Sequence, residues 1–156
     1  SMPNVQFTLV MPTFIQKYYS KIKISDNIHI FENVSLVEFN KLLQESSIVM
    51  LPLNTDAPAG LIVIFQAASQ QKTVITTSTP VTKEYIDNKT GVLCENNIDQ
   101  FRKEIEYHLQ HPDIARAKGK ALYNKLRSEC SKELYTSKLY NILLHNENRI
   151  SHTCIL

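Results

Sequence analysis

The chain has 156 residues, enough for one domain with a hydrophobic core, and 43% of them are hydrophobic and 21% charged. Its 17 basic and 15 acidic residues leave a net charge of only +2, which argues against a nucleic-acid-binding protein or one held on an anionic membrane surface. The three cysteines have neither disulfide-framework nor metal-ligand spacing, and no secretory signal or apolar run of about 18 residues occurs, so we expect a cytoplasmic protein.

The first part of the chain alternates short apolar strands with helical segments. Residues 5–10 and 27–31 are rich in β-branched and aromatic residues, which predicts strands, and residues 14–23 between them predict a short helix. Ser35 and Glu38 form the Ser-x-x-Glu pattern of a capping box, so a helix should begin there.

The middle of the chain repeats this alternation with more strongly apolar segments. Residues 48–51 form a continuous apolar run that Pro52 ends, as in a strand covered on both faces. A polar loop leads into residues 60–69, whose position between two strands favours a buried helix. Residues 73–77 and 92–94 predict two further strands, and residues 82–86 about one helical turn between them.

The remainder of the chain predicts helices. Phe101, Ile105 and Leu109 recur at helical spacing, and Pro112 followed by Asp113 is typical of a new helix start. A last apolar stripe predicts an amphipathic helix, with Tyr135, Leu139, Ile142 and Leu143 on one side. We expect residues 1–2 to be a cloning remnant, residues 3–146 one domain and residues 147–156 a polar, disordered tail.

Strands separated by helices predict an α/β fold, a Rossmann-like parallel sheet flanked by helices, with a helical C-terminus. Ligands of such sheets bind beyond the carboxyl ends of the strands, and the loop of residues 52–59 stands there. Gly60 then opens an apolar helix whose first N–H groups could bind an anion such as a diphosphate. The alternative is that this loop only turns the chain into a core helix. The chain has only three glycines, and they lie too far apart in the sequence to form a G-x-G-x-x-G phosphate loop.

Gln66 is a polar amide within this apolar helix. If buried it needs hydrogen-bond partners, and it could donate to and accept from ribose hydroxyls; it could equally lie at a solvated helix edge. Asp56 in the loop could bind a hydroxyl group, or be a solvated acid or a helix cap. The five histidines have no metal-ligand spacing, so we expect no metal site.

Residues 52–75 and 84–93 resemble the C-terminal domain of retaining GT-B glycosyltransferases, the glycosyl transferases group 1 or family four. Gln66-Ala67-Ala68-Ser69 falls on the family's E-A-M-A, and Thr73-Val74-Ile75 on its P-V-V. Pro58-Ala59-Gly60-Leu61 is similar to the P-A-G-Q of a polysaccharide-synthesising subset. The resemblance implies that the donor's diphosphate binds at Ala59, Gly60, Leu61 and Ile62, and its ribose at Gln66. It also implies that the base lies at Asn33, Val34 and Ser35, and that the sugar hydroxyls bind Asp56.

The resemblance implies a hexosyltransferase of polysaccharide biosynthesis whose substrate is a nucleotide-diphospho-sugar, with no other cofactor and no catalytic residue assigned here. Its partner would be an N-terminal acceptor domain, in cis or on a separate chain. Any membrane association would be peripheral and would be made by that domain. Two departures matter: Pro58 stands where the family has an acid, and the family's preceding strand and basic helix have no counterpart. We therefore expect this chain alone to be inactive. The alternative is a non-catalytic interaction module with a degenerate site.

Overall fold

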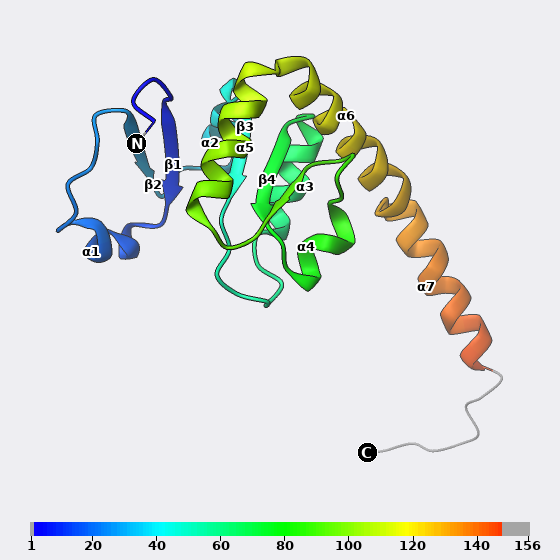
Figure 1. The fold of residues 1–156 in the computed structure, drawn as a ribbon. Coiled ribbons are helices and arrows are strands. Elements are labelled where there is room, and N and C mark those ends of the chain that lie inside the picture. Colours follow the sequence, from blue (N-terminus) through cyan, green and yellow to red (C-terminus); the bar gives the residue numbers. More distant parts are fainter. Residues whose placement is uncertain (1, 148–156) are drawn as a thin grey trace.

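The structure is a computed structural model that describes the backbone of residues 2–147 and the side chains of residues 2–144 (Figure 1). Ser1 and residues 148–156, most of the expected tail, lie outside the described residues. Strands alternate with helices in the predicted order. The strands are β1 (Phe7–Met11), β2 (Ile28–Glu32), β3 (Ile48–Leu51), β4 (Thr73–Thr77) and β5 (Val92–Cys94). The helices are α1 (Gln16–Tyr19), α2 (Leu36–Glu45), α3 (Leu61–Ser69), α4 (Pro80–Tyr85), α5 (Ile98–Gln110), α6 (Pro112–Glu129) and α7 (Lys132–Glu147).

All strand pairs are parallel, as the alternation predicts, and the α/β class with a helical C-terminus is confirmed. The single expected sheet is instead two ladders, β1-β2 and β3-β4-β5. In the second ladder Val49 lies beside Val74, and Ile75 beside Val92. β1 and β3 make no ladder with each other, and this separation is visible in Figure 1.

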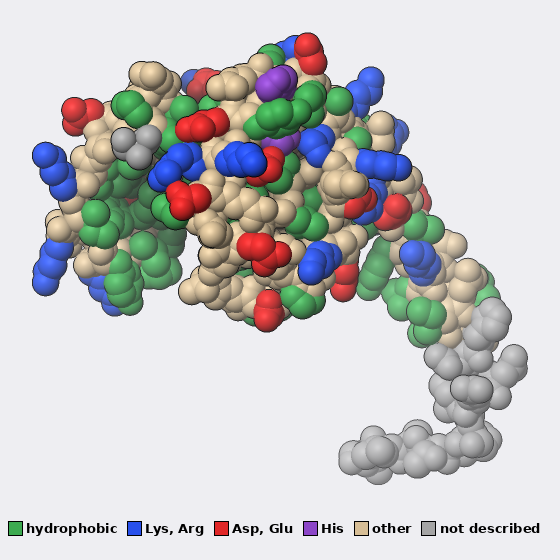
Figure 2. Space-filling model, in the orientation of Figure 1, with side chains coloured by type: hydrophobic (Ala, Val, Ile, Leu, Met, Phe, Trp, Pro, Cys, Tyr) green, Lys and Arg blue, Asp and Glu red, His purple; other side chains and the backbone are tan. Residues whose placement is uncertain are grey.

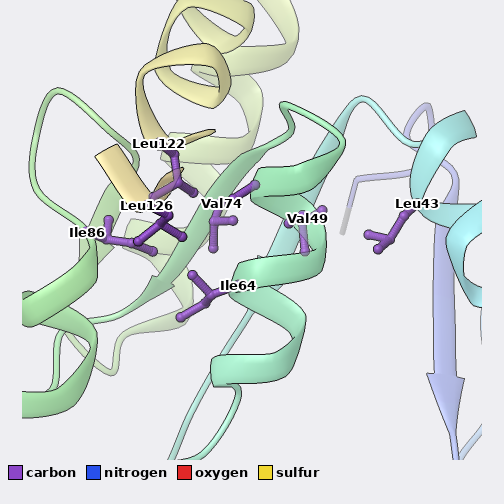
Figure 3. Packing of buried hydrophobic residues seen from close by; sticks show 9 residues of the cluster. Leu43, Val49, Ile64, Val74, Ile86, Leu122 and Leu126 are labelled. Carbon is purple, nitrogen blue, oxygen red and sulfur yellow. The ribbon is translucent and has the colours of Figure 1, made fainter. Parts of the chain in front are cut away.

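Alternate residues of the three-stranded ladder build a core on each face. On one face Val49 and Val74 pack with α2, α3 and α6, through residues that include Leu43, Ile64 and Leu122 (Figure 3). On the opposite face Ile75 and Cys94 pack with Phe101 and Ile105 of α5. This alternation follows from the period of two along a strand. Both faces of β4 are covered, and all five of its residues are buried.

Helix α6 lies unusually close to the turn before β4. A Cβ atom built on Gly119 would lie 2.0 Å from the carbonyl oxygen of Gln71, so only glycine fits at this crossing. Nearby, the hydroxyl of Thr73 donates a hydrogen bond to the carbonyl oxygen of Ala115. The position of α6 is therefore fixed by backbone contact as well as by its apolar side chains.

Two helix predictions need correction. The helix expected over residues 14–23 is only a 3-10 turn, Thr13–Ile15, followed by the four-residue α1, because neither element has a capping side chain or a buried residue to stabilise it. The apolar stripe of α7, Tyr135, Leu139, Ile142 and Leu143, is exposed, since α7 extends away from the rest of the chain (Figures 1 and 2). None of the helices among residues 2–147 is both long and apolar enough to cross a bilayer.

Candidate functional site

The candidate site lies where β3 ends, at the edge of the sheet to which all the strands point (Figure 1). The loop of residues 52–60 projects from this edge and returns into α3. Gly60 makes the return possible with a backbone φ of 74°, the left-handed region. A Cβ atom there would lie 2.5 Å from Leu51 Cδ2, so a larger residue would also collide with the end of β3.

The first turn of α3 presents free backbone donors. The carbonyl oxygen of Gly60 accepts the N–H of Ile64 at 3.0 Å, which is the first bond of the helix. Within residues 2–147, no acceptor is found for the N–H groups of Leu61, Ile62 and Val63, no side chain caps them, and the first turn contains no acid. Such a helix start attracts anions, because free N–H groups and the positive end of the helix dipole coincide.

Ala59 differs from the three residues that follow Gly60. Its N–H donates to the carbonyl oxygen of Ala57 at 2.6 Å. The N–H of this residue, which was predicted to bind the diphosphate, is therefore already hydrogen-bonded within the loop. The free donors therefore belong to Leu61, Ile62 and Val63. Gly60 serves them by allowing close approach of a ligand to the backbone.

Side chains from the neighbouring strand ends hold the loop. The N–H of Leu53 donates to Thr77 Oγ1 at 2.8 Å, and Thr76 Oγ1 donates to the carbonyl oxygen of Leu51 at 2.9 Å. Beyond β5, Asn96 Nδ2 donates to Asn54 Oδ1 at 3.1 Å. Thr76, Thr77 and Asn96 were not among the residues predicted to form the site. They could have been found as polar residues at the carboxyl ends of neighbouring parallel strands, where ligands of such sheets bind.

Gln66 lines a shallow recess on the outer side of α3, of about 400 Å³, with Leu61, Ile62, Phe65 and Ser69. The residue is half-buried, and its side-chain amide makes no hydrogen bond with any part of the chain that the structure describes. Ile62, one turn closer to the helix start, is 76% exposed. An unpaired amide beside an exposed apolar side chain can bond a ligand's hydroxyl groups.

Asp56 lies in the exposed part of the loop. Its carboxylate makes no ion pair or hydrogen bond with the residues described. Pro58, also exposed, follows it before the return at Gly60. The structure thus leaves Asp56 available to a ligand, without fixing its direction toward α3.

The residues predicted to contact the base follow β2. Asn33 has a φ of 49°, and its side chain bonds Thr13, accepting from the backbone N–H at 3.1 Å. Ser35 forms the predicted capping box with Glu38, which confirms the start of α2. Hydrogen bonds with Ser35 also hold the pKa of Glu38 below its usual value. Asn33 and Ser35 therefore stabilise local structure, and Val34 is half-buried between them.

These residues are not brought next to α3. They follow β2, the outer strand of its ladder, whereas the loop before α3 follows β3 of the other ladder. The two segments share the carboxyl edge, with β1 and the gap between the ladders separating them (Figure 1). Any ligand that contacted both would have to span this separation.

The second motif of the resemblance, residues 84–93, forms a turn before β5, at the opposite edge from the loop. Asp87 Oδ1 accepts the N–H groups of Lys89 at 2.9 Å and Thr90 at 3.1 Å, and Asp87 Oδ2 pairs with Lys125 at 3.1 Å. Partial burial raises the pKa of Asp87, but hydrogen bonds from Lys89, Lys125 and Thr90 outweigh it and lower the pKa to about 2. This motif therefore supports the fold, on the far side from the candidate site.

Comparison with known proteins agrees with this arrangement. Residues 11–125 match the family model described as "Glycosyl transferases group 1". No curated protein sequence matches the chain. Among solved structures, TarM is similar with a TM-score of 0.70 and 20% identity over 88% of this chain and 28% of TarM. A glycosyltransferase from Rickettsia africae ESF-5 is similar with a TM-score of 0.70 and 20% identity over 95% of this chain and 41% of that one.

The identities of 20% support the fold alone, and this chain spans well under half the length of either similar protein. The family match is broader than the motifs, since it runs from the end of β1 into α6. It therefore includes the loop of residues 52–60, α3 and the turn at Asp87. On this match, the chain belongs to the glycosyl transferases group 1.

Proposed function

We propose that this domain binds the nucleotide-diphospho-sugar donor of a glycosyltransferase, with the diphosphate at the start of α3. The observation that carries the proposal is the set of unpaired N–H groups at Leu61, Ile62 and Val63, at the carboxyl edge of a parallel sheet. A diphosphate matches them because its oxygens are anionic acceptors. In this arrangement Gln66 bonds the ribose and Asp56 the sugar hydroxyls.

The same donors would assist the reaction by stabilising negative charge. When the glycosidic bond to the donor sugar breaks, charge accumulates on the departing diphosphate, and fixed N–H groups stabilise it without having to reorient. No side chain of this chain is assigned to the reacting carbon. The acceptor-binding part, with the groups that face that carbon, belongs to an N-terminal domain in this proposal.

The charge near α3 predicts weak donor binding by this chain alone. Residues 52–69 contain no Lys or Arg, so backbone dipoles alone would neutralise a diphosphate. Hydrogen bonds to charged groups contribute about 1.5–3 kcal/mol each, and the missing basic side chains would have to come from the rest of the enzyme. We therefore propose that sugar transfer requires the acceptor domain.

The test is amide NMR of the chain during titration with uridine diphosphate glucose and, separately, guanosine diphosphate mannose. We expect one of them to shift the signals of Gly60 to Val63 and of Gln66. Gln66→Ala should weaken binding several-fold, because it removes the proposed ribose contact. Gln110→Ala on α5 is the matched control, because Gln110 is exposed and does not line this recess, and it should leave binding unchanged. Shifts confined to other segments would contradict the proposal.

The alternative function, a non-catalytic interaction module, is favoured by Pro58 at the position of the family's acid and by the absence of basic residues in 52–69. It predicts that neither nucleotide sugar shifts the α3 signals, even at millimolar concentration. It also predicts a protein partner whose binding does not change when nucleotide sugar is added. The NMR titration therefore separates the two functions.

A further inference from the structure

A further cavity lies at the amino edge of the three-stranded ladder, at the end of the sheet opposite the loop of residues 52–60. The strands β3 and β4 begin there, and α5 turns into α6 beside them (Figure 1). The cavity has a volume of about 580 Å³. Its lining residues include Ser47 before β3, Lys72 and Thr73 at the start of β4, His108 of α5, and Arg116 and Lys120 of α6.

Backbone contacts hold the walls of this cavity in place. Gly119 of α6 packs directly against the carbonyl group of Gln71, in the turn before β4. One turn earlier on α6, the carbonyl oxygen of Ala115 accepts the hydroxyl of Thr73. The first two turns of α6 are therefore fixed to the start of β4, and the cavity between them is part of the folded framework.

His108 brings an unpaired hydrogen-bonding atom to this cavity. The residue is only 2% exposed, and it lines the cavity. Its Nδ1 lies 2.8 Å from the carbonyl oxygen of Glu104, one turn back on α5, and 3.6 Å from the carboxylate of the same residue. Both are acceptors, so Nδ1 carries a proton. Nε2, on the other side of the ring, is directed away from the α5 backbone and has no partner in the part of the chain that the structure describes.

This unpaired nitrogen indicates what a ligand must bring. A buried polar atom without a partner destabilises a fold, and in native proteins such atoms are rare. With the proton on Nδ1, Nε2 of the uncharged ring is an acceptor that requires a donor, whereas in the imidazolium ring it is itself a donor. A ligand group that contains both a hydroxyl and free acceptor oxygens matches either form.

The charged side chains that line the cavity are all basic. They are Lys72, Arg116 and Lys120, and none of the lining residues that the structure describes is Asp or Glu. Lys72 Nζ donates to the carbonyl oxygens of Gln44 and Ser46 at the end of α2, at 2.6 and 2.7 Å. Because an ammonium group has three N–H donors, one remains for a ligand. The lining therefore favours an anion.

The start of α6 adds to this positive potential. Pro112 and Ala115 of its first turn line the cavity. No side chain caps the turn, and the N–H groups of Asp113 and Ile114 have no acceptor among residues 2–147. Asp113 does pair with Arg116, but their side chains are 91% and 72% exposed, so solvent weakens this pair and leaves Arg116 able to bind another anion.

We propose that this cavity binds a small phosphate-bearing anion, either inorganic phosphate or a phosphate monoester. The phosphate oxygens would accept from Lys72, Arg116 and Lys120, and a P–OH group would donate to His108 Nε2. An ionised carboxylate or a sulfate has acceptors but no such donor. Arg116 and Lys120 are exposed, so their side chains can move to admit the phosphate to Nε2. This proposal does not rest on the proposed function, whose site lies at the opposite edge of the sheet.

The test is NMR of the backbone amides and of the histidine ring nitrogens. The chain is titrated separately with inorganic phosphate, glycerol phosphate and sodium sulfate, at constant ionic strength. We expect phosphate to shift the signals of His108 Nε2 and of the Asp113 and Ile114 amides, and sulfate to bind at least about fivefold more weakly, because it lacks the hydroxyl donor. Whichever phosphate compound binds more tightly identifies the source of the anion.

Two results of these titrations would overturn the proposal. Phosphate shifts confined to Gly60 to Val63 would mean that phosphate binds only at the start of α3, which would leave the proposed function intact. Equal affinity for sulfate and phosphate would mean that the cavity attracts anions by charge alone, without a hydrogen bond to His108 Nε2.

Variants of the exposed basic residues test the site without disturbing the core. Arg116→Ala and Lys120→Ala should each weaken phosphate binding several-fold, because each removes a charged hydrogen-bond donor. Lys103→Ala is the matched control, since Lys103 is exposed on α5 and does not line the cavity, and it should leave binding unchanged. Phosphate affinities of all three variants equal to that of the original chain would overturn the proposal.

Two variants of His108 test the contact at Nε2. His108→Gln places an amide nitrogen near the position of Nε2 and should retain part of the phosphate affinity. His108→Leu removes every hydrogen-bonding group and should lower the affinity by at least about tenfold. Undiminished phosphate binding by His108→Leu would overturn the proposed contact. If His108→Leu does not fold, the Arg116 and Lys120 variants still decide the proposal.

Discussion

The three-stranded ladder and the two-stranded ladder are built from similar residues but are buried very differently. Every residue of β4 is buried, whereas β1 and β2 have no buried residue. All three strands are rich in β-branched or aliphatic residues, so composition does not explain the contrast. β4 has a strand on each side and helices on both faces, and β1 has one neighbour and the gap. Coverage by neighbouring elements, more than residue type, determines which strands form core.

The helices of the two regions differ in the same way. Around β4, α3, α5 and α6 each contribute buried side chains to a cluster. Beside β1 and β2, α1 has four residues and none of them is buried. Stability should therefore be concentrated in the three-stranded ladder and its helices. Three predictions test this contrast.

The largest expected difference is between two isoleucines truncated to alanine. Ile64 of α3 is fully buried, so Ile64→Ala should lower the free energy of unfolding by about 4 kcal/mol, through lost apolar burial and the cavity it leaves. Ile30 of β2 is half-buried, and Ile30→Ala should cost about 1 kcal/mol. Urea unfolding measures both. Equal losses would show that the two-stranded ladder contributes as much stability as the other.

A smaller loss is expected at the crossing of α6 with the turn before β4. Gly119→Ala gains about 1 kcal/mol of helix propensity, but its Cβ would collide with the backbone of Gln71. Displacing α6 should cost more than that gain, with a net loss of about 2 kcal/mol in thermal unfolding. Lys120→Ala at the exposed neighbouring position is the control and should have little effect. A stabilised Gly119→Ala protein would mean that α6 is free to shift.

The smallest expected effect depends on pH. The pKa of Asp87 falls from an ordinary 3.8 to about 2 in the folded chain, so its stabilisation is complete above about pH 4 and is lost as pH falls toward 2. Because its side chain is 47% exposed, the contribution should be only about 0.5–1 kcal/mol. Asp87→Asn should remove it and flatten the stability curve across that window.

The control for this titration is Asp113→Asn, which removes a more exposed ion pair with Arg116. It should leave the slope between pH 4 and 2 close to that of the original chain. An equal flattening in both variants would mean that the slope arises from general charge repulsion in acid. The Asp87 turn would then contribute nothing of its own.

Structural features that depend on residues close together in the sequence could be predicted. The strands, the capping box at Ser35, the start of α6 at Pro112 and the helix after Gly60 all appear where local patterns indicate. Contacts between distant segments could not be predicted this way. Lys125 pairs with Asp87 across 38 positions, and Gly119 is required by the carbonyl of Gln71. The division into two ladders also follows from long-range pairing, since each strand by itself resembles any other.

The candidate site was predictable as a location more than as a set of contacts. The loop after β3 and the free donors of α3 follow from a polar segment, a glycine and an apolar helix. The engagement of Asn33 with Thr13 and of the Ala59 amide with Ala57 depends on backbone geometry that no spacing indicates. The exposure of the α7 stripe likewise reflects the absence of a neighbour among the described residues.

The direction of the crossovers reverses at the gap, where one connection leads toward β2 and the others toward β5. In open parallel sheets such a reversal separates the adjoining loops and leaves a crevice at the carboxyl edge. The loop that feeds α3 borders that crevice on the side of the three-stranded ladder.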